Sequence, residues 1–291
     1  MNEGRPSRTA QRVAVRRAAH QLIDRPLVFE DPFAMRIIGP DAAAATEAKA
    51  EGSVSAAFRA FMAVRSRYAE DELRCAVERG VRQYVVLGAG LDTFAWRNPY
   101  PELRVFEVDF PATQHWKKQR VANVGMELPE SLTFAPVDFE SQTLADGLRA
   151  AGFREDQPAY FSWLGVTMYL TTEAFESTMR FIGSLPPGGG VTFDYAVERS
   201  ELSFLERMAI DRLSKKVAAL GEPFQLFFRP HELASAMQRF GFREIEDMGR
   251  DELNARYFGH RDDGLRVRGA AGRLMRARNL SQFCGAGQGG L

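Results

Sequence analysis

Two stretches of the chain contain residues whose types and spacing suit the binding of a nucleoside. Residues 84–93 read YVVLGAGLDT, an apolar run that breaks into Gly88-Ala89-Gly90. The first glycine permits a tight turn from strand to helix, and the second removes the side chain where a ligand must approach the backbone. Nineteen residues past Gly90, a second apolar run ends in Asp109. A carboxylate at the end of the next strand can accept hydrogen bonds from both hydroxyls of a ribose.

The residue at position 93 indicates which nucleoside is bound. A dinucleotide-binding fold places a third glycine there so that the helix packs closely beneath a pyrophosphate, whereas this chain has Thr93. S-adenosylmethionine has a ribose and an adenine but no phosphate, so it fits these signals better than NAD or FAD does. The sequence therefore predicts S-adenosylmethionine as the cofactor and leaves a nicotinamide-dependent oxidoreductase as the alternative.

An alternation of strands and helices after residue 80 would bring these residues together. It favours an α/β fold with a mostly parallel sheet and helices on both faces, in which ligands lie beyond the carboxyl ends of the strands. Gly88, Asp109, Asp138 and the segment 164–169 all follow such ends, so they converge on one rim. The strands are expected at 84–87, 104–108, 133–137, 160–166, 191–195, 242–248 and 273–278.

The first 80 residues contain no clear strand, and their apolar periodicity predicts helices over 8–24, 33–38 and 53–79. Because these helices have no strand of their own to pack on, we expect residues 1–80 to form a helical lid. Residues 81–291 would form the cofactor-binding core of the same single domain. A helical insertion at 198–221 would help to cover the rim.

Composition excludes several classes of protein. The 291 residues include 38 basic and 38 acidic side chains, so no global charge attracts nucleic acid or an anionic membrane. No apolar run approaches the ~20 residues that span a bilayer, and no secretory signal is recognisable. Cys75 and Cys284 stand alone, which predicts neither a disulfide framework nor a metal site. We expect a soluble, cytoplasmic protein, and the oligomeric state stays open.

A group of arginines near the C-terminus resembles a basic patch of the kind that binds nucleic acid. Acidic residues are interspersed with them, and no aromatic residues are placed for base stacking, so a solvated face is the better interpretation. The arginines are those at 261, 266, 268, 273, 276 and 278.

Seven ordered stretches match one family pattern. They are SRTAQRVAVRRAAHQLIDRPLVFEDPFAMRIIG at 7–39, VRSRYAEDEL at 64–73, QYVVLGAGLDTFAWR at 83–97, RVFEVDFPATQHWKKQRV at 104–121, PVDFE at 136–140, MYL at 168–170 and GEP at 221–223. Together they resemble the leucine carboxyl methyltransferase and polyketide-type O-methyltransferase family. That resemblance implies an S-adenosylmethionine-dependent enzyme on a seven-stranded, Rossmann-like methyltransferase sheet.

The resemblance also implies which residues hold the cofactor. Gly88, Ala89 and Gly90 would line its methionine part, and Asp109 would hold the ribose hydroxyls. Asp109 also suits a helix N-cap, because it stands two residues before a proline.

Three further residues are implied for the other ends of the cofactor. Asp138, with the backbone of Phe139, would read the adenine by accepting from its exocyclic amine. Arg65 would pair with the cofactor's carboxylate, which guanidinium geometry favours. Asp138 as an ordinary loop acid and Arg67 as an equally placed arginine remain as alternatives.

One departure from the family bears on the methyl acceptor. Carboxyl methyltransferases carry a glutamate after the fourth strand, where this chain has Leu164. Carboxyl specificity is therefore not implied, and the polyketide-type members are the closer kin. The expected acceptor is a hydroxyl or carboxyl group of a small molecule, such as a secondary metabolite. A non-catalytic protein that binds the cofactor is a second alternative.

The catalytic residue is not determined by the sequence. Transfer to a carboxylate needs no general base, whereas transfer to a phenol or alcohol is helped by one near the rim. The candidates are His20, His115, His231 and Tyr195. His20 lies in an amphipathic helix, where a packed histidine is the more ordinary role, and His231 suits a solvent-exposed first turn.

Overall fold

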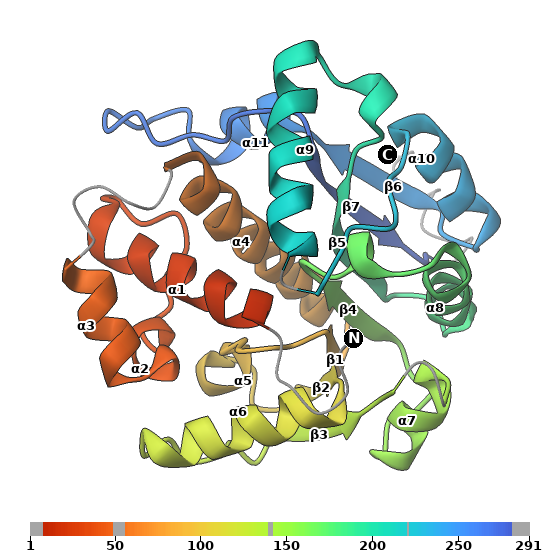
Figure 1. Ribbon diagram of the computed structural model, residues 1–291. Helices are drawn as coiled ribbons and strands as arrows, with labels where there is room; N and C mark the ends of the chain where they lie inside the picture. The colour runs from red at the N-terminus through yellow and green to blue at the C-terminus, as the bar shows by residue number, and fades with distance from the viewer. Residues whose placement is uncertain (1–7, 49–55, 139–141, 220, 281–291) are drawn as a thin grey trace, which may run out of the picture.

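The computed structural model describes residues 8–48, 56–138, 142–219 and 221–280. Its centre is a seven-stranded sheet of order β3-β2-β1-β4-β5-β7-β6, which Figure 1 shows near its middle. All neighbours are parallel except β7, which runs antiparallel to β5 and β6. The predicted mostly parallel α/β sheet is confirmed. The strands are β1 (Gln83–Leu87), β2 (Arg104–Asp109), β3 (Leu132–Pro136), β4 (Ala159–Trp163), β5 (Gly190–Ala196), β6 (Glu244–Met248) and β7 (Gly272–Arg278).

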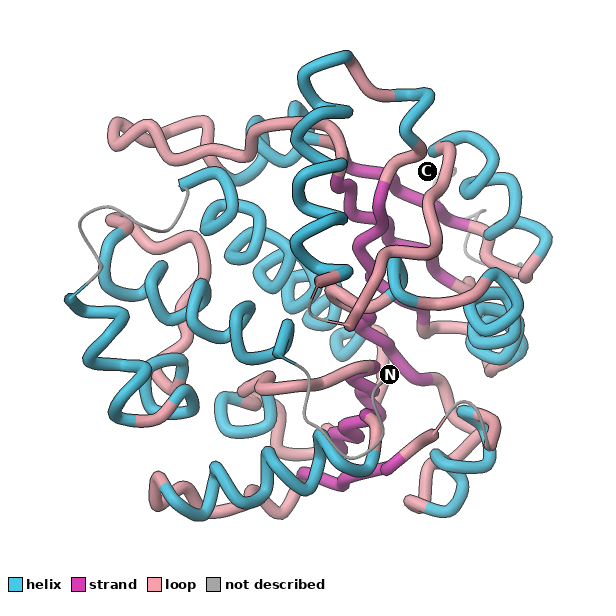
Figure 2. The backbone as a smooth tube through the Cα atoms, viewed as in Figure 1, coloured by secondary structure: helices cyan, strands magenta, loops and turns pink. Residues whose placement is uncertain are grey.

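Helices lie on both faces of the sheet, so that the strands are enclosed between them (Figure 2). One face carries α7, α8 and α10, and the other carries α4, α5 and α11. The helices are α1 (Arg8–Ile23), α2 (Ala34–Ile38), α3 (Pro40–Ala48), α4 (Ala56–Glu78), α5 (Phe94–Arg97), α6 (Pro111–Asn123), α7 (Leu144–Ala150), α8 (Thr172–Ser184), α9 (Phe204–Ala218), α10 (Pro230–Arg239) and α11 (Arg250–Tyr257), with short 3-10 helices η1 (Thr167–Tyr169) and η2 (Arg199–Glu201).

The central strands are continuous apolar runs because both of their faces are covered. Every residue of β1, β4 and β5 is buried. Side chains alternate between the faces, so Val85 and Phe161 pack with α8 and α10, whereas Tyr84 and Tyr160 pack on the side of α4 and α5. This alternation fixes the register of the strands and therefore the positions of their carboxyl ends.

Strand β4 ends at Trp163, three residues before its predicted end. The reason is Gly165, which has φ +77° and turns the chain away from the ladder. Its N–H donates to the carboxylate of Asp194 instead of to a neighbouring strand. The segment 164–169 is therefore a loop and a 3-10 turn at the rim.

Helix α4 packs directly against β4 and β5, so it belongs to the layer that covers the sheet. Its Tyr68 is fully buried and donates a hydrogen bond to Glu246, 2.6 Å away on β6. The three helices before it lie together beside α4 at the left of Figure 1. Ala18 and Ile37 of this group share a hydrophobic cluster with Leu91 and Val121 of the core.

The predicted helical insertion contains η2 and α9, and the segment that follows crosses the carboxyl ends of two strands. Gln225 donates its N–H to Met168 O at 2.7 Å, beyond β4. Phe228 donates to Ala196 O at 2.9 Å and forms an isolated parallel bridge with Val197, beyond β5. Residues 221–229 therefore cover part of the rim. Within the described ranges, no helix has both the length and the apolar character needed to cross a membrane.

Candidate functional site

The turn after β1 needs both of its glycines. Gly88 and Gly90 have φ values of +64° and +49°, in the left-handed region that side chains disfavour. A Cβ added to Gly88 would lie 2.3 Å from Cγ2 of Val166, in the loop after β4. A Cβ on Gly90 would lie 3.0 Å from Cβ of Ala10, in α1. The turn is thus held between the β4 loop and the first helix.

Asp109, the last residue of β2, is bonded to this turn. Its Oδ2 accepts a hydrogen bond from Gly90 N at 2.6 Å, and its Oδ1 accepts one from Phe110 N at 2.7 Å. It is not the N-cap of α6, because Phe110 occupies that position without a side-chain cap. Each carboxylate oxygen keeps a lone pair that can accept from a ribose hydroxyl.

Burial raises the pKa of Asp109 above its usual value, while the N–H groups of Gly90 and Phe110 oppose that shift because they favour the carboxylate. The negative charge of Glu222, in the segment after α9, adds to the upward shift. Asp109 is therefore a carboxylate whose protonation state is sensitive to nearby charges.

Thr93 forms a buried side-chain hydrogen bond that a glycine at this position could not form. It is fully buried, and its hydroxyl donates to Oδ2 of Asp31 at 2.8 Å. Arg17 of α1 pairs with the same oxygen at 2.7 Å and also donates to Leu91 O at 2.6 Å. This buried network connects the N-terminal helices to the loop that follows the Gly88–Gly90 turn.

Arg65 lies at the same rim, on the side of β4. It is buried, and its Nη1 contacts Oδ2 of Asp194 on β5 at 2.8 Å. A Cβ added to Gly165 would lie 3.0 Å from Nη1 of Arg65, so the guanidinium is beneath the β4 loop. Arg67, the alternative from the sequence, is instead a surface residue paired with Asp71 at 3.0 Å. The pairing of Arg65 with a cofactor carboxylate stays a prediction.

Asp138 is half-buried and follows β3. Val137 donates its N–H to Asp109 O at 3.0 Å, which places the segment after β3 beside the end of β2. Asp138 accepts a backbone hydrogen bond from Gln142 N at 2.9 Å through its carbonyl oxygen. Phe139, the other residue assigned to the adenine, lies outside the described residues.

Three residues that the sequence did not single out for a role also meet at this rim. Thr9 of α1 donates to Oε2 of Glu222, and it is also hydrogen-bonded to the Tyr169 hydroxyl of η1. Burial raises the pKa of Tyr169 to about 12, and its hydrogen bond with Thr9 opposes the shift. The sequence signals for these residues were that Thr9, Tyr169 and Glu222 fall in the matched stretches 7–39, 168–170 and 221–223, and that Tyr169 ends the segment 164–169 expected at the rim.

Of the four candidate bases, His20 is engaged in structural contacts. His20 is fully buried, its Nδ1 is 2.8 Å from Asp24 Oδ2, and its Nε2 accepts from Val28 N at 3.1 Å and Phe29 N at 3.3 Å. Its Nε2 must carry the lone pair, so the proton is on Nδ1 and neither nitrogen is free for substrate. The structure thus favours the packed role for His20.

Tyr195 is buried and donates its hydroxyl to Asp247 at 3.0 Å. Burial, together with the charge of Asp247, raises its pKa far above the usual value, so the hydroxyl keeps its proton and donates it to Asp247. His115 lies at the surface beside Gln119, and His231 lies at the surface 3.9 Å from Glu232. None of these contacts brings a candidate base to the rim.

The part of the chain that the structure describes contains no group of three or more His, Cys, Asp or Glu side chains that could hold a metal ion. Four of the six C-terminal arginines have mostly buried side chains and form ion pairs, so the predicted solvated face is wrong for them and their contacts are structural. The pairs are Arg261–Asp263, Arg273–Asp247, Arg276–Glu244 and Arg278–Glu244.

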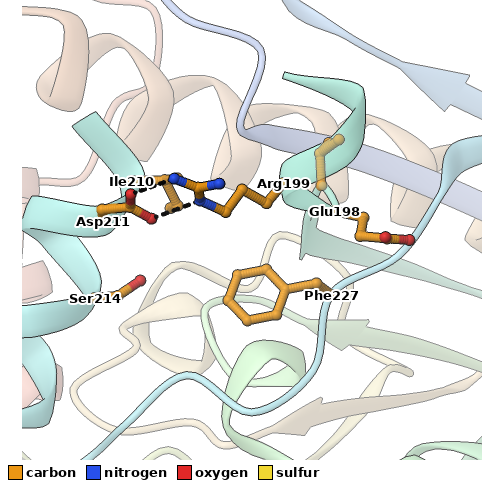
Figure 3. Close-up of a pocket in the computed structure, with 7 residues that line it drawn as sticks. Glu198, Arg199, Ile210, Asp211, Ser214 and Phe227 are labelled. Atoms are coloured by element: carbon orange, nitrogen blue, oxygen red, sulfur yellow. Dashed lines mark hydrogen bonds and ion pairs between the residues drawn. The ribbon is translucent and has the colours of Figure 1, made fainter. Parts of the chain in front are cut away.

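A small pocket opens beyond β5, between α9 and the segment 221–229 (Figure 3). Its volume is about 160 Å³, and its lining surface is almost entirely carbon. Figure 3 shows Ile210, Asp211 and Ser214 of α9 across from Phe227, with Arg199 bonded to Asp211 at one edge. An apolar cavity of about 150 Å³ holds one benzene ring, so this pocket suits a single ring.

A row of aromatic rings connects that pocket to the rim. The ring centroids of Phe227 and Phe224 are 6.3 Å apart, and those of Phe224 and Tyr169 are 5.3 Å apart. The pocket is therefore two ring contacts away from the loop that follows β4.

Comparison with known proteins gives a consistent result. A family model described as leucine carboxyl methyltransferase matches residues 10–183. YktD of Bacillus subtilis, described as an S-adenosyl-L-methionine-dependent methyltransferase, is 37% identical over 204 residues, which are 69% of this chain and 67% of that protein. A protein of the same description from Parafrankia sp. is 37% identical over 157 residues, which are 54% of this chain and 49% of that one.

Two solved structures share the fold. A methyltransferase structure from Thermobifida fusca has a TM-score of 0.59 at 17% identity, covering 96% of this chain and 97% of its own. A DUF574 family protein from Streptomyces avermitilis has a TM-score of 0.51 at 18% identity, covering 90% and 99%. The whole α/β arrangement, including the N-terminal helices, thus has a counterpart among solved structures.

Proposed function

Because the chain belongs to the leucine carboxyl methyltransferase family, we propose that it methylates a hydroxyl or carboxyl oxygen of a small molecule. The chain is an S-adenosylmethionine-dependent methyltransferase, and S-adenosylmethionine is its cofactor. Membership of this family removes the nicotinamide-dependent oxidoreductase from consideration. The observation that carries the location of the site is the bond between Asp109 and the Gly88–Gly90 turn.

We assign the cofactor to the rim formed by the ends of β1, β2, β3 and β4. Gly88, Ala89 and Gly90 would line its methionine part, where side chains are absent or small. Asp109 would accept from the ribose hydroxyls, since each of its oxygens has a lone pair left after its backbone bond. The strand order supports this assignment, because β1, β2 and β3 are neighbours in the sheet.

The two ends of the cofactor would be held by residues on opposite sides of this turn. Asp138, with Phe139, would read the adenine next to the end of β2. Arg65 would face the cofactor carboxylate from beneath the β4 loop, and its pairing with Asp194 would keep the guanidinium in place. The same pairing balances a buried positive charge when no ligand is present.

S-adenosylmethionine supplies both the methyl group and the leaving group when it is bound. The task of the chain's own residues is to align the acceptor with the methyl group and to exclude water. We propose that α1–α3 and the segment 221–229 form the cover, since Ala10 lies against Gly90 and Thr9 is bonded to Glu222. Helix α4 belongs to the sheet layer, so the covering segment would be Arg8–Ala48.

The pocket beyond β5 supports an acceptor with one apolar ring, of the kind found in secondary metabolites. Its carbon-rich surface would contact an apolar ring, with the Arg199–Asp211 pair at one edge, and its volume of about 160 Å³ corresponds to about one ring. The row formed by Phe227, Phe224 and Tyr169 would guide the rest of the acceptor toward the rim.

A hydroxyl acceptor would need a group to take its proton, and Glu222 is a carboxylate placed at this rim. If the acceptor is a hydroxyl, Glu222→Gln should lower kcat by about 10²-fold or more, because general-base catalysis contributes about 10²–10⁴-fold. Cofactor affinity should stay within a few-fold of wild type, because the amide still accepts from Thr9. The readout is transfer of labelled methyl from S-adenosylmethionine to a panel of single-ring phenols, alcohols and carboxylic acids.

Glu232→Gln provides the matched control, because Glu232 is an exposed glutamate in the first turn of α10. An unchanged kcat in Glu222→Gln, together with an alkali-labile methyl ester as product, would assign the acceptor as a carboxyl group. Absence of transfer to every member of the panel, with normal cofactor binding, would favour the non-catalytic alternative.

A further inference from the structure

A buried ion pair lies beside the loop that continues the Gly88–Gly90 turn. Nζ of Lys117, on α6, is 2.6 Å from Oε2 of Glu107, on β2, and both side chains are only 1% exposed. The same ammonium group donates to Asp92 O at 2.7 Å, in the loop that continues the turn. Lys117 therefore joins β2 to this loop at a second point, besides the bond between Asp109 and Gly90.

Stability alone does not account for this arrangement. Removing two charges from water costs several kcal/mol per ion, and apolar residues of similar volume stabilise such positions equally well or better. Oε1 of Glu107 is also buried and has no hydrogen-bond partner among the described residues. A pair that is incompletely satisfied and deeply buried next to a candidate site suggests a functional reason for the charge.

Asp109 is the nearby carboxylate whose ionisation the charge of Lys117 would influence. Glu107 and Asp109 are two residues apart on β2, so their side chains point to the same face about 7 Å apart. Lys117, Asp92 and Asp109 are the charged groups that act on Glu107, and Lys117 and Glu222 are those that act on Asp109. Lys117 is the cation in that set, so it is the group that offsets a concentration of negative charge.

We propose that Lys117 is a positioning residue that keeps Asp109 ionised and fixes the loop at Asp92, so that the ribose hydroxyls meet a carboxylate. This inference rests on the proposed role of Asp109 as the ribose acceptor. Lys117 would act through Asp109 and would not touch the cofactor.

The chemistry of the two acids agrees with this role. Burial raises the pKa of Asp109, and the charge of Lys117 lowers it. Burial also raises the pKa of Glu107, with Lys117 opposing, so Glu107 takes up a proton more readily than an exposed glutamate. Without Lys117, Asp109 would bind a proton at a higher pH, and the charged acceptor would be lost as the pH falls.

The test measures the affinity for S-adenosylhomocysteine by calorimetry from about pH 6 to about pH 9, a range that lies above the ordinary pKa of aspartate. Lys117→Met should bind progressively more weakly than wild type as the pH falls toward about 6, because a larger share of Asp109 is then protonated in the variant than in wild type. At the alkaline end, where Asp109 is ionised in both proteins, the difference should shrink to about threefold or less. The matched control is Lys118→Met, which removes a charge from the exposed side of α6.

A double variant distinguishes an effect of Lys117 on Asp109 from its effect on Glu107. It also leaves no unpaired buried charge that could cause misfolding. Glu107→Gln combined with Lys117→Met leaves a neutral pair of similar volume, and it should keep the pH-dependent loss because Asp109 still lacks its cation. Recovery of wild-type affinity in the double variant would mean that Lys117 serves only to neutralise Glu107, which would overturn the proposal. A loss in Lys117→Met that is equal at all pH values would indicate packing alone and would also overturn it.

Asp109→Asn, measured in parallel, distinguishes this inference from the proposed function. If Asp109→Asn binds weakly and Lys117→Met shows no pH-dependent loss, the role of Lys117 is wrong and the ribose assignment stands. If Asp109→Asn binds as tightly as wild type, the ribose assignment fails, and the role of Lys117 fails with it.

Discussion

Asp109→Asn should lower the affinity for S-adenosylhomocysteine by about 10- to 100-fold, equivalent to about 1.5–3 kcal/mol. The substitution removes the charge that accepts from the ribose hydroxyls and leaves a side chain of the same size. One amide oxygen can still accept from Gly90 N or Phe110 N, so the turn keeps part of its support. Calorimetry gives the affinity, and thermal unfolding of the same samples gives the stability.

The control for this substitution is Asp263→Asn. Asp263 likewise accepts a backbone hydrogen bond, from Leu265 N at 3.1 Å, but in a surface loop away from the strand ends. It should bind the cofactor as wild type does. An Asp109→Asn protein that melts about 5 °C lower yet binds normally would show that Asp109 only supports the turn.

Gly88→Ala should also reduce cofactor affinity by at least about tenfold, because two costs combine at this position. A non-glycine residue in the left-handed region costs about 1–2 kcal/mol. The new methyl group would in addition lie 2.3 Å from Cγ2 of Val166, so either the turn or the β4 loop must move. Both segments line the proposed site, which makes affinity the sensitive measurement.

Gly264→Ala is the control that measures the cost of a non-glycine residue in the left-handed region without any steric contact. Gly264 has φ +71°, close to the +64° of Gly88, and an added Cβ would meet no atom within 4 Å. It should lose stability but keep wild-type affinity. Combining Gly88→Ala with Val166→Ala should restore only the share of affinity lost to the contact. Wild-type affinity in Gly88→Ala itself would place the cofactor elsewhere.

The features that the sequence predicted well depend on local signals. Runs of buried apolar residues and the glycines that end them are readable without tertiary information, so the strands and the turn at Gly88 were correctly placed. The spacing from Gly90 to Asp109 was informative for the same reason, since adjacent parallel strands bring their ends together. The second glycine and the carboxylate are in fact bonded to each other.

The features that the sequence missed depend on partners that are distant in the chain. Arg65 was singled out, but its pairing with Asp194 across 129 positions follows from the packing of α4 on β5. The premature end of β4 likewise results from the bond between Gly165 and Asp194. Glu222 lies in a recognisable stretch, yet its position beside α1 depends on the path of the chain after α9.

The burial of Lys117 is a further feature that could not be predicted from the sequence. Two consecutive lysines on an amphipathic helix are chemically alike in the sequence, but Lys117 is buried against Glu107, whereas Lys118 is exposed. The difference arises from the rotation of α6 about its axis, which is set by Pro111 at its start and by the packing of the helix. Only the structure identifies which of the two charges can act on the site.

The most direct test of the central claim is a crystal structure of the protein with S-adenosylhomocysteine bound. We expect both ribose hydroxyls within hydrogen-bond distance of the Asp109 carboxylate, about 2.5–3.0 Å. The adenine amine should face Asp138, the amino-acid carboxylate should face Arg65, and α1 should lie across the ligand. A ribose bound away from Asp109, or a cofactor seated in the pocket under α9, would contradict the account.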